Sequence, residues 1–205
     1  TVTQTVGGEL TIGLHNEAET MDAHKLGGET GVGSHIWEGL NTIDINQGIN
    51  PRLARYWVAD GLNWDFHLRE NVKFHDGTPF NAEAAKINFE RFTGEGFPSA
   101  SAFEAVTSYE VVDEYTLKLV CNKPFPGIDY ALLDERVSFL SPESIDKFGD
   151  DLGTSPETLV ATGPYKLEEW VKRDHFTLVR NDDYWLGVPQ NKKITIKIIP
   201  EESSR

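Results

Sequence analysis

Glycines and small polar residues are concentrated in the stretch from Gly27 to Ser34, where successive backbone N–H groups could hold an anion. The stretch lacks the Lys-Ser/Thr ending of a phosphate-binding loop. Its glycines also do not follow the G-x-G-x-x-G spacing of a dinucleotide site. The pattern therefore favours a turn that brings the backbone close to a ligand over a nucleotide site.

Three residues near one predicted hairpin are of types that bind metals: His67, His75 and Asp76. Such a trio is common on surface hairpins, and no H-E-x-x-H or comparable spacing accompanies it, so we expect no metal site. The G-x-S-x-G turn of a serine hydrolase is absent, and no catalytic pair of carboxylates can be singled out among 33 acidic residues. The sequence therefore predicts a protein that is not an enzyme and that needs no cofactor.

Two residues are candidates for contacts with a ligand. Phe103 follows the Gly/Ser/Pro-rich segment from Gly94 to Ser101, where an aromatic side chain can face a ligand. Arg136 is an isolated cation among apolar and acidic neighbours. It either meets an anionic ligand or pairs with Asp134 or Glu135, and the sequence alone favours the pairing.

Cys121 is the only cysteine, which excludes an intramolecular disulfide and any multi-cysteine metal site. It shares its alternation with Leu117 and Leu119, as a thiol on the buried face of a strand would. We therefore expect a core cysteine and no catalytic thiolate.

The charge balance argues against nucleic acid as a partner. There are 19 basic and 33 acidic residues, which give a net charge of −14 and a field that repels phosphate backbones. No apolar run approaches the roughly 18 residues that a membrane span requires. The chain begins at Thr1 without a basic and then apolar leader, which predicts either a cytoplasmic protein or an exported one whose signal peptide has been removed.

Hydrophobic periodicity predicts a mixture of strands and helices. Alternation indicates strands over residues 9–14, 62–68, 109–112, 116–121, 165–170, 176–180 and 194–199. Helices are expected over about 29–40, from the Asn81 cap to about Phe92, and from Ser141-Pro142 onward. Because strands outnumber helices and neighbours look hairpin-connected, the expected fold class is α+β.

Several runs, taken together and in this order, resemble the signature of extracellular solute-binding protein family 5, the peptide- and nickel-binding components of ABC importers. They are residues 7–10, 35–40, 53–57, 64–83, 161–167 and 180–185. The longest reads Trp-Asp-Phe-His-Leu-Arg-Glu-Asn-Val-Lys-Phe-His-Asp-Gly-Thr-Pro-Phe-Asn-Ala-Glu. Each run is weak alone, and together they cover nearly the whole chain.

The resemblance implies a periplasmic-binding-protein-like fold with two lobes that close on a ligand. Residues 1–40 and 163–205 would form a discontinuous first lobe, a mixed sheet with helices. Residues 41–162 would form an inserted α/β subdomain. The second lobe is expected to be absent, since Pro200 to Arg205 read as the start of a helix that does not continue.

The resemblance also implies a function. The chain would belong to a monomeric substrate-binding component that captures a peptide or similar small solute and delivers it to an ABC permease in the membrane. Its location would be periplasmic or on the cell surface, with the signal peptide removed. A nickel or nickel-chelate binding protein of the same fold and a chemosensory binding domain are the alternatives, and a hydrolase is less favoured.

The family pattern carries over to a small set of ligand-contacting residues: Glu29, Thr30, Phe103, Arg136 and Val137. Thr30 and Ala100 stand where nickel-chelate binders have a methionine and a second arginine. Because of these replacements, we expect a peptide or another organic solute as the ligand and not nickel.

Overall fold

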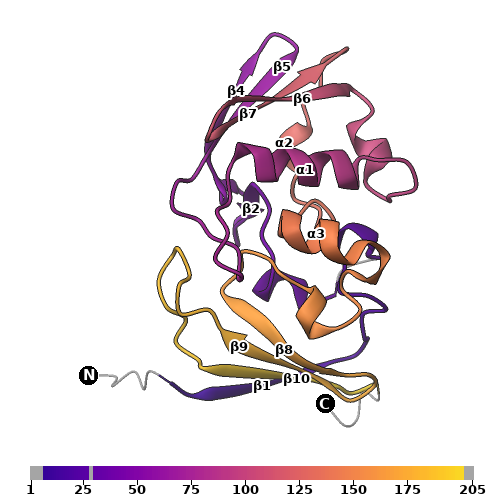
Figure 1. Cartoon of the computed structure of the whole chain (residues 1–205), viewed down its shortest axis with the longest axis vertical. Coiled ribbons are helices and arrows are strands. Elements are labelled where there is room, and N and C mark those ends of the chain that lie inside the picture. The colour runs from indigo at the N-terminus through magenta and orange to yellow at the C-terminus, as the bar shows by residue number, and fades with distance from the viewer. Residues whose placement is uncertain (1–6, 28–29, 201–205) are drawn as a thin grey trace.

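Two four-stranded sheets lie at opposite ends of the chain's computed structural model, which describes residues 7–27 and 30–200 (Figure 1). The lower sheet consists of β1 (Glu9–Leu14), β8 (Tyr165–Val171), β9 (His175–Arg180) and β10 (Lys193–Ile198). Its order is β1-β10-β9-β8, with β1 and β10 parallel and the other pairs antiparallel. The N-terminal strand β1 therefore forms one edge of a sheet whose other three strands come from the C-terminal part of the chain.

The upper sheet is antiparallel throughout and comes from the middle of the chain. It consists of β4 (Ala54–Asp60), β5 (Asn63–Leu68), β6 (Val106–Asp113) and β7 (Thr116–Cys121) in the order β4-β5-β7-β6. Helix α1 (Ala82–Phe92) packs along one face of this sheet (Figure 1). With a single parallel pair among the four-stranded sheets, the arrangement has the α+β character that the sequence predicts.

Shorter elements connect the two sheets. Strand β2 (Asn41–Ile43) pairs with β3 (Ile49–Pro51), and α2 (Ile128–Ala131) and α3 (Pro142–Phe148) lie between the sheets in Figure 1. Five 3₁₀ turns span Ala23–Lys25, Gly33–His35, Ala100–Phe103, Gly149–Asp151 and Pro156–Thr158. Within the described ranges, no helix has the length and apolar character needed to cross a membrane.

Most of the predicted elements are confirmed, and one is wrong. The side chain of Asn81 caps α1 by accepting a hydrogen bond from the N–H of Ala84 at 2.9 Å. In place of the expected helix over 29–40, the structure has only the turn Gly33–His35. The hydroxyl of Thr30 accepts hydrogen bonds from the N–H groups of Val32 and Gly33, which closes a local turn that competes with a helix.

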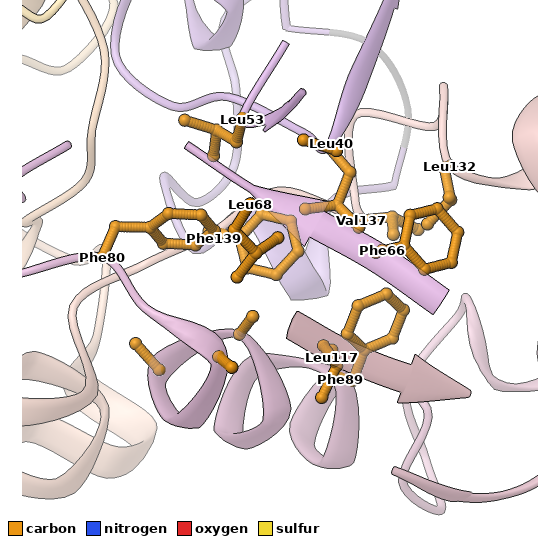
Figure 2. Packing of buried hydrophobic residues seen from close by; sticks show 14 of the residues in the cluster. Leu40, Leu53, Phe66, Leu68, Phe80, Phe89, Leu117, Leu132, Val137 and Phe139 are labelled. Atoms are coloured by element: carbon orange, nitrogen blue, oxygen red, sulfur yellow. The ribbon is translucent and has the colours of Figure 1, made fainter. Parts of the chain in front are cut away.

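The apolar side chains form two separate clusters, one for each sheet. The upper cluster packs β5 and β7 against α1, and Figure 2 shows Phe66, Leu117, Phe89 and Phe139 meeting there. The lower cluster has these buried members: Met21, Leu26, Ile36, Trp37, Leu140, Leu152, Leu159, Tyr165, Phe176, Leu178, Ile194 and Ile196. Residues 140–161 thus contribute to the lower cluster, although the predicted subdomain runs to residue 162. The predicted division at residues 40 and 163 stays a prediction.

A buried polar network ties α1 to the lower part of the molecule. Arg91 donates from Nη1 and Nη2 to the two oxygens of Asp22, at 2.9 and 2.6 Å, and its Nη1 also lies 2.6 Å from Nδ1 of His24. Since a guanidinium can only donate, His24 accepts at Nδ1 and donates from Nε2 to the carbonyl of Ser138 at 2.8 Å. The imidazole is therefore neutral.

A second neutral histidine anchors the turn after β5. The ring of His75 lies 3.0 Å from the carbonyl of Gly163 through Nε2 and 3.4 Å from the N–H of Ala161 through Nδ1. Burial is the main cause that lowers the pKa of both His24 and His75 to about 4. The cations beside them, Arg91 and Lys166, act in the same direction.

These two histidines predict acid sensitivity of the fold. An unfolded histidine, with a pKa of about 6.5, binds a proton between pH 6.5 and 4, whereas the folded one stays neutral. The free energy of unfolding should therefore fall as the pH drops through this window, by about 2 kcal/mol for each histidine at pH 5. Urea unfolding at pH 7, 6 and 5 measures this fall, and an unchanged midpoint would contradict it.

Candidate ligand cleft

A cleft with a volume of about 600 Å³ opens beside the loops that follow β1. One wall comes from residues 27–43 and the other from residues 132–138, with Arg52 at the edge. Its lining residues are Gly27, Gly31, Ser34, Trp37, Glu38, Gly39, Asn41, Thr42, Ile43, Arg52, Leu132, Leu133, Asp134, Glu135, Arg136 and Ser138. The volume suits a small organic ligand.

Thr30 and Glu135 join the two walls. The backbone N–H of Thr30 donates to Oε2 of Glu135 at 3.0 Å, and its hydroxyl donates to Oε1 at 2.9 Å. The same hydroxyl accepts from the backbone of Val32 and Gly33. A carboxylate that receives two hydrogen bonds from one residue fixes both the backbone and the rotamer of that residue.

Gly33 lets the two walls approach this closely. A Cβ atom at this position would lie 1.9 Å from Oε1 of Glu135 and 2.2 Å from the ring of Trp37. Both distances are far below van der Waals contact, so only glycine fits here without a shift of its neighbours. The glycine at position 33 is thus explained by side-chain packing against its backbone.

Arg136 lies in the cleft wall, where it pairs with Asp134. Its Nε and Nη2 donate to the two carboxylate oxygens at 2.8 and 2.5 Å. These hydrogen bonds hold the pKa of Asp134 below its usual range and raise the pKa of Arg136. The pairing favoured by the sequence is therefore present, and in the described part of the chain the Nη1 atom of Arg136 makes no hydrogen bond.

A buried carboxylate stands at the back of the cleft. The Glu38 side chain, only 2% exposed, accepts from Arg52 at 2.6 Å, from the Tyr184 hydroxyl at 2.7 Å and from the Trp185 indole at 3.0 Å. Burial, followed by the charge of Glu38, raises the pKa of Tyr184, which keeps its hydroxyl protonated as the donor. The loop after β9 rises from the lower sheet to reach this point (Figure 1).

The structure brings together only some of the residues that the sequence singles out as ligand contacts. Arg136 lines the cleft, Thr30 lies behind the lining and donates to Glu135, and Glu29 lies outside the described residues. The Phe103 side chain is 2% exposed and packs on Phe89, Phe92 and Phe125 in the upper cluster, and its role as a ligand contact stays a prediction.

Val137 is also buried, and its role as a ligand contact stays a prediction. Its side chain is 1% exposed and lies within the upper cluster beside Leu132 and Phe66 (Figure 2). Its neighbours on both sides, Arg136 and Ser138, line the cleft. Its backbone N–H donates to the carbonyl of Asp134 at 2.9 Å, which closes a turn at this point.

Sequence reasoning missed Trp37, Glu38 and Glu135. Glu38 carried a usable signal, because it is an acidic residue inside the apolar run Ile-Trp-Glu-Gly-Leu and such a residue is buried only with partners. Glu135 carried none, since its partner Thr30 is 105 residues away. No group of three His, Cys, Asp or Glu side chains suited to a metal ion occurs among the described residues.

A comparison with protein-family models identifies the family of the chain. The model of bacterial extracellular solute-binding proteins, family 5, matches residues 48–205, which is more than half of the chain. This chain belongs to that family. The cleft is therefore part of a protein in a family of transport solute-binding proteins.

The names of similar curated proteins are consistent with this family. The probable D,D-dipeptide-binding periplasmic protein DdpA of Escherichia coli is 35% identical over 157 residues, which cover 75% of this chain and 30% of the relative. The glutathione-binding protein GsiB of Salmonella typhi is 32% identical over 179 residues, which cover 85% of this chain and 34% of GsiB. The chain thus spans about a third of the length of these relatives.

Solved structures show the same fold. AgaA from Agrobacterium, in complex with agropinic acid, superposes with a TM-score of 0.88 at 28% identity over 97% of this chain and 41% of that one. NikZ from Campylobacter jejuni, in complex with Ni(L-His), superposes with a TM-score of 0.85 at 26% identity, over 96% of this chain and 40% of the NikZ chain. The mixed fold of these binding proteins is therefore present here.

We expect Gly33→Ala to destabilise the protein by about 2 kcal/mol, because overpacked sites typically lose 1–3 kcal/mol. The added methyl group must push Glu135 or Trp37 aside, which also separates Glu135 from Thr30. Urea unfolding measures the loss. Gly27→Ala is the matched control, since no heavy atom of the described residues lies within 4 Å of a Cβ there, and equal losses in the two variants would contradict the close approach.

Proposed function

We propose that this chain forms one wall of the solute cleft in the substrate-binding component of an ABC importer. The component holds a peptide or a similar small solute between two lobes and delivers it to a membrane permease. The observation that carries the proposal is the family match together with a cleft whose walls are fixed by Thr30 and Glu135. The cleft binds and orients a solute without transforming it.

The domain arrangement belongs to the same proposal. Residues 1–40 and 163–205 form the first lobe around the lower sheet, and residues 41–162 form the inserted subdomain around the upper one. A second lobe covers the cleft, and closure buries the solute between the lobes, so that affinity arises from contacts made in the closed state. A receptor that works this way is monomeric and extracytoplasmic.

The side chains of the cleft favour a solute that carries a carboxylate. Arg136 keeps Nη1 available while Asp134 holds its other edge, so the guanidinium is oriented before the solute arrives. A charge-assisted hydrogen bond to a carboxylate contributes about 1.5–3 kcal/mol. The D,D-dipeptide and glutathione named for two relatives both carry carboxylates.

A nickel chelate is the second candidate, favoured by the likeness to NikZ in complex with Ni(L-His). In this case Arg136 would meet a carboxylate of the chelating ligand, and the metal would be cargo. A chemosensory role uses the same capture step and differs only in the membrane partner.

The test is a titration of the ¹⁵N-labelled chain with reduced glutathione and with D-alanyl-D-alanine, followed by NMR. One wall of a cleft binds weakly, so millimolar ligand is required. We expect the amide signals of residues 30–43 and 132–138 to shift, and Arg136→Ala to weaken binding by about 10-fold or more, as the loss of a charge-assisted bond predicts.

The matched control is Arg55→Ala. Arg55 is also exposed and paired, with Glu70 at 3.7 Å, but it lies outside the cleft. Equal affinity in Arg136→Ala and the unmodified chain would remove Arg136 from the site. Consumption of either peptide during the titration would contradict capture without chemistry.

A further inference from the structure

Arg52 is a second cation in the lining of the ligand cleft, and part of its guanidinium is already engaged. Its side chain is 28% exposed. Nε donates to Oε1 of Glu38 at 2.6 Å, and Nη2 donates to the hydroxyl of Tyr184 at 2.5 Å. Within residues 7–27 and 30–200, the Nη1 atom of Arg52 makes no hydrogen bond. The donors on Nη1 are therefore left for a ligand.

The contacts that hold Arg52 come from behind the cleft. Tyr184 is not one of the lining residues, and neither is Trp185, whose ring centroid lies 5.6 Å from the guanidinium carbon. The backbone is fixed as well, because its N–H donates to the carbonyl of Leu40 at 2.9 Å and its carbonyl accepts from Nε of Arg69 at 2.6 Å. A guanidinium restrained in this way loses little freedom when it binds a ligand.

Arg136 has the same arrangement in another part of the lining. It is 32% exposed, it donates from Nε and Nη2 to Asp134, and it also keeps Nη1. Arg91 differs, because it is 12% exposed and both of its Nη atoms donate to Asp22. Arg91 is therefore a structural arginine, whereas the two arginines of the cleft each retain donors that the fold does not use.

The charges around the cleft make these donors selective. Each guanidinium is balanced by a carboxylate of its own, Glu38 for Arg52 and Asp134 for Arg136. The chain as a whole has a net charge of −14, so its long-range field does not favour anions. A preference for an anionic solute must then arise from local charge-assisted hydrogen bonds.

We infer that Arg52 is a second carboxylate-binding residue and that the cleft selects solutes with two carboxylates. Arg136 binds one carboxylate and Arg52 binds the other, within one cleft of about 600 Å³. The inference rests on the proposed function and deepens it, since it names the class of solute and assigns a second residue to its recognition.

The experiment uses two pairs of dipeptides that differ only in one carboxylate: alanyl-glutamate with alanyl-glutamine, and alanyl-aspartate with alanyl-asparagine. Affinities come from NMR titration of the ¹⁵N-labelled chain at millimolar peptide. We expect a dicarboxylate to bind about 10-fold more tightly than its amide in at least one pair, as one charge-assisted hydrogen bond predicts. The Nε–H signal of Arg52 should shift with that dicarboxylate and not with its amide.

Arg52→Gln is the variant, because its side-chain amide can still donate to Glu38 while the Nη1 donors are lost. We expect the dicarboxylate and its amide to bind this variant equally. Arg55→Gln is the matched control, since Arg55 is an exposed arginine that pairs with Glu70 at 3.7 Å and lies outside the cleft lining. It should keep the preference. If Arg52→Gln does not fold, the Nε–H signal of Arg52 in the unmodified chain decides.

The outcomes separate the two proposals. Equal affinity within both pairs of dipeptides would overturn the inference and leave the proposed function standing. A preference that persists in Arg52→Gln, or one that leaves the Nε–H signal of Arg52 unmoved, would also overturn it, since the second carboxylate would then bind elsewhere. No binding of any dipeptide to the unmodified chain would overturn both.

Discussion

The structure depends on the buried carboxylate of Glu38. A carboxylate that is 2% exposed is stable only when its lone pairs are satisfied, and here Arg52, Tyr184 and Trp185 supply the donors. These partners come from segments up to 147 residues away. Removal of one partner from a buried ion pair typically costs about 3–5 kcal/mol, so this residue holds the segments together strongly.

The position of Glu38 explains why the cleft lies where it does. Trp37 belongs to the lower hydrophobic cluster and Leu40 to the upper one, so the chain passes from one core to the other at this residue. The cleft is built on the same passage, from residues 27–43 and 132–138. The neutral His24 reinforces the second wall through the carbonyl of Ser138. A wall held by such hydrogen bonds would need less ordering on binding of the proposed solute.

Local patterns in the sequence predicted the strands other than β2, β3 and β4, the cap of α1 and the burial of Cys121, because these features depend on alternation and on neighbouring residues. The helix over 29–40 failed, since the hydroxyl of Thr30 and the packing against Gly33 outweigh periodicity there. The burial of Phe103 in the upper cluster could not be predicted, because a Gly/Ser/Pro-rich setting does not reveal which way an aromatic side chain points. The Thr30–Glu135 contact could not be predicted from the sequence, since the two residues are 105 positions apart and only the complete fold brings them together.

The most direct test of the central claim is a crystal structure of the receptor containing this chain, purified from its own host with the solute that it retains. The account predicts density for a small solute in the cleft, in contact with Arg136 and with the segment around Thr30. A retained solute bound elsewhere, with this cleft filled by the protein's own side chains, would contradict it.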